Sequence, residues 1–281
     1  MRNATPEPRD FELVIEAGRL DLQYWKDLWR YRDLLWILCR RDLTVRYKQT
    51  VIGALWAVIR PLVTILTFTL LLGKVAKLPS EPGVPYSALV FSGMLIWNFF
   101  AQCLGDASNS LLANANLVGK IYLPRLLIPV SAVAVAAADF AVALVLFAGL
   151  LWWFGIAPPL QCALLPVFVL LAGLLALGPG LVLAALSLPY RDIRHTIPVI
   201  VQLGMYVSPV VYTSALVPEK WQWLYILNPM VGVVDGFRWA ALGSPAFPAL
   251  SLAVSCAWCA GLLLAGMTLF RRMERTFVDV L

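Results

Sequence analysis

The chain has 281 residues, of which 61% are hydrophobic and 14% are charged, and its mean hydropathy is +0.80. This apolar surface exceeds what a soluble domain of this length buries, so the composition excludes a soluble protein and predicts a single membrane domain. The formal charge of +6 does not indicate a nucleic-acid partner, because the basic residues flank apolar runs instead of gathering on a polar surface.

Residues 1–50 are predicted to form a cytoplasmic segment that contains an amphipathic interface helix. The first 33 residues are polar and lack the apolar core of a signal peptide. Over residues 24–48, basic and aromatic side chains recur at helical spacing, so one side of the expected helix is charged and the other aromatic. Such a helix lies along the cytoplasmic leaflet, either as a simple anchor or with a further role.

Residues 51–281 are predicted to form an all-α integral membrane domain with six transmembrane helices. The expected spans are 51–72, 86–112, 126–154, 160–188, 197–212 and 247–270. Connectors rich in Pro, Gly or charge separate them, and the fifth span is short.

Residues 213–242 hold apolar pieces that are each too short to cross a membrane, because Pro218 and the pair Asn228-Pro229 interrupt them. Irregular backbone at membrane depth needs cover from protein or from a water-filled cavity. The pattern therefore predicts a re-entrant helical hairpin that serves as an outer gate. The alternative is an outer loop with an aromatic belt.

The distribution of basic residues predicts that both termini are cytoplasmic. Of the 22 Lys and Arg residues, four fall on the outer side of a six-span topology, namely Lys74, Lys77, Lys220 and Arg238. Arg60 lies inside the first span, and the other seventeen fall on the inner side. This imbalance follows the positive-inside rule.

The sequence contains no source of energy for transport. The phosphate-binding motif G-x-x-x-x-G-K-[ST] is missing, and the ionisable residues within the spans are too few for ion coupling: Arg60, Asp106, Asp139 and, near a span end, His195. We therefore expect no catalytic residue, metal or cofactor on this chain, with ATP and Mg bound by a partner. An intramembrane enzyme would need clustered acids, and none is apparent in the sequence.

Two features within the spans are candidates for substrate contact. Arg60 would face either an anionic pyrophosphate or sugar, or else pair with Asp106 or Asp139 across helices. Aromatic residues away from the expected interfaces would either stack against sugar rings or pack against lipid. They are Phe68, Phe91, Trp97, Phe99, Phe100, Tyr206 and Tyr212.

Several motifs in order resemble the ABC-2 type permeases that export polysaccharides and polyol phosphates, the membrane subunits of O-antigen or teichoic acid exporters. The first is CRRDLTVRYKQT at 39–50 with GALWAVIRP at 53–61, and the second is NSLLANANLVGKIYLPR at 109–125. The others are YRDIR at 190–194, SPVVY at 208–212, Asn228-Pro229 and RRMER at 271–275. The similarity spans roughly residues 24–281.

The resemblance implies a homodimeric channel joined to two copies of an ABC ATPase subunit, and it assigns four groups of residues. Coupling to the ATPase falls to Asn116, Lys120, Tyr122, Pro124, Arg125, Arg191, Asp192 and Arg194. Substrate access and head-group binding fall to Arg40, Arg41, Arg46, Lys48 and Arg60. The channel lining would be Trp56, Phe68, Trp97, Tyr206 and Tyr212, and the outer gate Trp221, Trp223, Tyr225, Asn228 and Pro229.

The resemblance also implies the function. The chain is expected to be a non-catalytic, multi-pass permease subunit of the bacterial inner membrane that exports a lipid-linked polysaccharide such as O-antigen. Its partners would be a second copy of itself, the ATPase subunits, the polysaccharide and membrane lipids, but no nucleic acid. The alternative cargo is teichoic acid, a small lipid or a drug.

Overall fold

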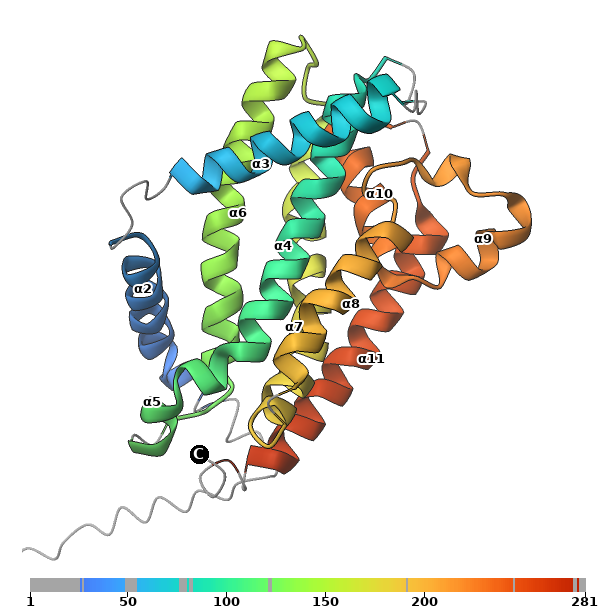
Figure 1. Cartoon of the computed structure of the whole chain (residues 1–281). Helices are drawn as coiled ribbons and strands as arrows, with labels where there is room; N and C mark the ends of the chain where they lie inside the picture. The colour runs from blue at the N-terminus through green and yellow to red at the C-terminus, as the bar shows by residue number, and fades with distance from the viewer. Residues whose placement is uncertain are drawn as a thin grey trace, which may run out of the picture.

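The computed structural model describes residues 26, 28–48, 55–75, 80, 83–120, 123–190, 192–244, 246–274 and 277. The side chains of residues 55–58, 60, 61, 65, 72 and 120 lie outside this description. Every regular element in the described ranges is a helix, which confirms the all-α prediction (Figure 1).

Four helices are long and apolar enough to cross a membrane. They are α4 (Tyr86–Ala113), α6 (Leu127–Trp153), α7 (Leu165–Ser187, preceded by the 3-10 turn Leu160–Leu164) and α11 (Ala249–Met273). They match the predicted second, third, fourth and sixth spans, and in Figure 1 they run side by side.

The other two predicted spans are shorter elements at the edge of this group. The first corresponds to α3 (Leu55–Phe68) and a π-helix over Thr69–Val75, which together cross α6 and α4 near one end of the molecule in Figure 1. The fifth corresponds to α8 (Ile193–Val207), which has 15 residues. Its length gives a rise of about 22 Å, less than a bilayer core.

The segment 213–242, predicted to form a re-entrant hairpin, contains two helices of unlike environment. A short 3-10 turn (Ser214–Leu216) leads to α9 (Glu219–Ile226), none of whose residues is buried. In α10 (Pro229–Leu242) most residues are buried. The break between them lies at Asn228-Pro229, where the Asn228 side chain accepts a hydrogen bond from the Met230 backbone N–H and caps α10.

Two smaller elements lie toward the opposite end. α2 (Arg32–Lys48) packs along α6, and α5 (Ala115–Lys120) follows α4 directly. α2 buries Leu38 and Cys39 against the other helices, whereas Trp29 and Trp36 are 71% and 70% exposed. These two tryptophans therefore face away from the protein, as expected for side chains in contact with lipid.

The core is formed where α4, α6, α7 and α10 meet. Phe91 and Phe147 pack edge to face there with ring centroids 5.3 Å apart, and Phe237 packs beside them. α7 and α11 approach closely through glycine: a methyl group on Gly266 would lie 2.3 Å from the carbonyl oxygen of Gly178. Small residues permit such close contact between helices in membranes.

Candidate functional site

A polar cluster joins α2 to the long helices α4 and α6. Asp139 is near the middle of α6, and its carboxylate accepts hydrogen bonds from Arg46 and Tyr47 of α2. Gln102 of α4 donates to the same carboxylate over 2.6 Å, and Arg46 also pairs with Asp106 of α4 over 2.8 Å. These five residues, called here the α2 cluster, come from three helices.

The α2 cluster contains charges of opposite sign, and this pairing explains why ionised side chains are tolerated among apolar helices. Two carboxylates share one guanidinium, and the side chains of Arg46, Asp106 and Asp139 are 35%, 33% and 16% exposed. Burial, followed by the neighbouring Asp139 carboxylate, raises the pKa of Tyr47 to about 12, so its hydroxyl remains a donor at neutral pH. Partly exposed ion pairs of this kind contribute little to stability by themselves.

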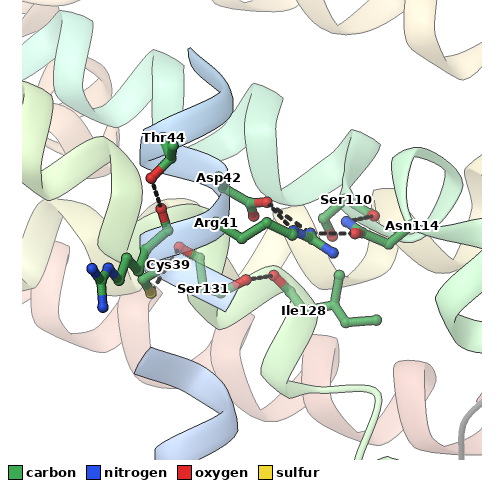
Figure 2. A network of polar contacts seen from close by, with 9 residues as sticks. Cys39, Arg41, Asp42, Thr44, Ser110, Asn114, Ile128 and Ser131 are labelled. Atoms are coloured by element: carbon green, nitrogen blue, oxygen red, sulfur yellow. Dashed lines mark hydrogen bonds and ion pairs between the residues drawn. The ribbon is translucent and has the colours of Figure 1, made fainter. Parts of the chain in front are cut away.

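A second set of polar contacts, shown in Figure 2, ties α2 to the junction of α4 and α5. Arg41 pairs with its neighbour Asp42 and donates to the side-chain oxygen of Asn114 over 2.6 Å. Asn114 is the residue at which α4 ends. On the α6 side, the Cys39 thiol lies 3.7 Å from the carbonyl oxygen of Ser131. α2 is thus linked to both α6 and the start of α5.

The residues predicted to bind a head group are not gathered at one point. Arg40, Arg41 and Lys48 are exposed on α2, whereas Arg46 lies between the two acids of the α2 cluster. The side chain of Arg60 lies outside the described residues. The alternative predicted for Arg60 is a pairing with Asp106 or Asp139. In the structure, both of these acids pair with Arg46.

Those residues predicted to couple to an ATPase that the structure describes lie at one end of the molecule. α5, the turn between α7 and α8, and the end of α11 share this end in Figure 1. Asn116, Asp192 and Arg194 are exposed there, and Pro124 is buried. Arg125 donates to the backbone carbonyl of Glu274, and its guanidinium lies 5.7 Å from the ring of Phe277.

The contacts of Arg125 attach the segment after α5 to the end of α11, so this cation is engaged within the chain. Tyr122, Arg191 and the side chain of Lys120 lie outside the described residues.

The predicted channel residues differ in exposure. Trp97 is buried beneath α8, where a methyl group on Gly204 would lie 3.0 Å from its ring. Phe68 is half-buried, and Tyr206 is exposed. Tyr212 is half-buried and donates weakly to the carbonyl of Tyr206, 3.4 Å away. The side chain of Trp56 lies outside the described residues.

The predicted gate residues separate along the hairpin. Trp221 and Trp223 are exposed on α9, whereas Tyr225 is half-buried, with its ring 6.5 Å from that of Tyr212. Asn228 and Pro229 form the first turn of α10, and the Asn228 amide also donates to the Ser208 hydroxyl over 2.9 Å.

One arginine has a role that the charge count did not indicate. Arg238, counted above among the outer cations, is 1% exposed. It donates to the carbonyl oxygens of Val210 and Tyr212 over 2.7 and 2.8 Å, and to that of Leu89 over 3.3 Å. An ionisable residue within the apolar sequence of α10 was the available signal, because such residues are rarely without a specific partner in membranes.

The described part of the chain gathers no group of three or more His, Cys, Asp or Glu side chains that could hold a metal ion. Its polar groups instead link helices to one another. Long apolar helices with polar links between them define a multi-pass helical membrane protein.

The family is shown by comparison with known proteins. Residues 33–242 match the ABC-2 type transporter family, so the chain belongs to it. An O-antigen export system permease protein, RfbA, from Klebsiella pneumoniae is 26% identical over 254 residues, covering 89% of this chain and 95% of the relative. RfbA from Myxococcus xanthus is 27% identical over 215 residues, covering 76% and 82%.

A third relative is the polysialic acid transport protein KpsM from Escherichia coli, which is 22% identical over 243 residues, covering 85% of this chain and 92% of the relative. The family membership confirms the resemblance drawn from the motifs. Both sets of relatives are named for the transport of polysaccharides.

Proposed function

We propose that this chain is the permease subunit of an ATP-driven exporter that moves a lipid-linked polysaccharide such as O-antigen across the bacterial inner membrane. The observation that carries the proposal is the similarity to O-antigen export permeases over 95% of the length of one such relative. The four long apolar helices support a multi-pass membrane location.

Energy would come from a separate ATPase subunit at the end of the molecule that bears α5. Asn116, Asp192 and Arg194 are exposed there and offer polar groups to a partner. The sequence supports the need for such a partner, because it lacks a phosphate-binding loop. With the α5 end facing the cytoplasm, both termini would be cytoplasmic, and α9 would lie on the outer side of the membrane.

A second copy of the chain would complete the channel. α8 exposes apolar side chains along one side, including Val199, Ile200 and Leu203, and the adjacent Tyr206 is exposed as well. In α3, Leu62, Val63 and Leu66 are exposed as well. We propose that α3 and α8 cross the membrane as the first and fifth spans, and that these sides meet the partner copy and the cargo.

Deletion of the gene tests the cargo. We expect surface polysaccharide to disappear and lipid-linked polymer to accumulate inside the cell, with both effects reversed by the gene supplied in trans. Normal surface polysaccharide after deletion would reject the proposal. Loss of teichoic acid export, or of drug or small-lipid export, would assign one of the alternative cargoes.

Substitution at the exposed coupling residues tests the partner. Arg194→Asp combined with Asn116→Arg should abolish co-purification of the ATPase subunit, because charge and shape change on a surface without changing the core. Lys220→Glu, an exposed charge reversal on α9, is the matched control and should leave the complex intact. Undiminished co-purification with the double variant would place the ATPase elsewhere.

A further inference from the structure

The segment 208–212, which follows α8, has backbone carbonyls that no regular helix can satisfy. α8 ends at Val207, and the chain then turns irregularly toward the hairpin. Ser208 and Val210 are buried, so water does not reach their backbone freely. At membrane depth an unpaired carbonyl is costly, and the chain must supply donors from side chains.

Two side chains provide these donors to three consecutive carbonyls. Arg238 of α10 donates to the carbonyls of Val210 and Tyr212, and the Tyr86 hydroxyl of α4 donates to the carbonyl of Val211 over 2.6 Å. Arg238 also reaches the carbonyl of Leu89 in α4. The guanidinium therefore joins the segment to α4 and α10 at once, which its planar set of five donors permits.

The backbone of α4 is shaped to receive the segment. A methyl group on Gly93 would lie 2.2 Å from the Val210 carbonyl oxygen and 2.7 Å from the Arg238 guanidinium. Only glycine therefore allows the carbonyl and the guanidinium to meet on the surface of α4. Asn228 adds a fourth contact through the Ser208 hydroxyl.

α8 itself is held loosely. Ile197 is its one buried residue among the fifteen, all of which are described. Its outer end is therefore defined by the contacts of the segment 208–212 more than by its own packing. Tyr206, which lies just before this fixed segment, and Tyr212, its last residue, are the two tyrosines proposed to line the channel.

We infer that Arg238 is a positioning residue for transport: it anchors the segment 208–212 on α4 and α10, and it thereby sets where the outer end of α8 and its channel-facing tyrosines stand. The inference rests on the proposed function for its role in transport. The anchoring itself does not depend on the identity of the cargo.

The test measures exposure of the segment from outside the cell. Val211→Cys, in a background with the five native cysteines replaced, puts a thiol at a site that is 8% exposed. A membrane-impermeant maleimide should label it slowly. Adding Arg238→Gln should raise the labelling rate roughly tenfold or more, as expected when charged hydrogen bonds to the backbone are lost. Arg238→Lys and Tyr86→Phe should give intermediate rates.

Two controls separate anchoring from charge and from misfolding. Lys220→Gln removes another outer cation from the exposed α9 and should leave the labelling of Val211→Cys unchanged. Leu160→Cys, 93% exposed at the turn before α7, should label at the same rate in every variant if the fold is intact.

An unchanged labelling rate in Arg238→Gln would overturn the inference. If Arg238→Gln fails to accumulate in the membrane, Arg238→Lys and Tyr86→Phe decide the question. Labelling of Val211→Cys faster than in the chain with Arg238 and Tyr86 supports the inference, and labelling at the same rate overturns it. Export is measured in parallel and should fall with rising exposure in the Arg238 series. Absence of polysaccharide export in the chain with native Arg238 would reject the proposed function, while the labelling rates still judge the anchoring.

Discussion

Two arginines within the helical bundle meet opposite surroundings. Arg46 is about one-third exposed and lies between the carboxylates of Asp106 and Asp139, whereas Arg238 is 1% exposed and donates to three backbone carbonyls. The first connects one helix to two others through side chains alone. The second supports backbone that has no helix to satisfy it. A cation at membrane depth can therefore serve either as a link between helices or as a substitute for secondary structure.

The difference predicts how each region responds to a change. Contacts between partly exposed side chains are weakened by water and can be remade, whereas a buried carbonyl that loses a charged donor cannot replace it freely with water. We therefore expect single substitutions around Arg238 to lower the free energy of unfolding more than single substitutions in the α2 cluster.

Arg238→Met should have the largest effect. It leaves the carbonyls of Val210, Tyr212 and Leu89 without this donor in a buried site, at a cost of about 3 kcal/mol or more in the free energy of unfolding. Unfolding of the purified protein in mixed detergent micelles would measure the loss. Lys220→Met is the matched control on the same side of the membrane, and a loss of equal size there would remove the distinction between a buried and an exposed cation.

Gly93→Ala should come next, because the added methyl group would overlap the Val210 carbonyl oxygen. We expect a loss of about 2 kcal/mol, typical of overpacking. The control is Gly149→Ala in α6, where an added methyl group meets nothing within 4 Å. Equal stability of the two variants would show that the segment 208–212 does not lie on α4 as described.

Asp139→Asn should have a smaller effect, about 1–2 kcal/mol, since the amide oxygen can still accept one of the bonds from Arg46, Tyr47 and Gln102. A double-mutant cycle with Arg46→Met would measure the coupling between the two residues through the same unfolding experiment. Additive losses would mean that the α2 cluster is a set of neighbours without mutual dependence.

The loss of folding stability at alkaline pH should depend in part on Tyr47. Its folded pKa, about 12, exceeds the ordinary value of 10.0, so the folded state keeps a proton that the unfolded state loses. The contribution is complete below about pH 10 and disappears as the pH rises toward 12. Tyr47→Phe should flatten the decline over this range relative to the native chain. An identical decline in both would contradict the raised pKa.

The sequence was sufficient to predict the helices that are encoded by long apolar runs. Four apolar runs of span length became α4, α6, α7 and α11, and the break at Asn228-Pro229 appeared where it was predicted. Hydropathy and proline act on the segment that carries them, so the long helices and the break can be predicted without knowing which helices pack together. The motifs likewise identified the family.

The partners of the charged residues could not be predicted in the same way. The sequence groups Arg46 with the head-group cations and offers Asp139 as a partner for Arg60, because a single sequence does not show which helix α2 lies against. Arg238 was counted as one outer cation among four for the same reason. Both roles depend on contacts between residues far apart in the chain, such as the 149 positions that separate Arg238 from Leu89.

The glycine contact between α7 and α11 would limit where the proposed cargo could travel. Backbone meets backbone at Gly178 and Gly266, which leaves no width for a sugar ring between the two helices. A route that cannot open along this boundary must lie against another side of the chain. This boundary is closed without any charged or polar barrier, simply by the absence of two methyl groups.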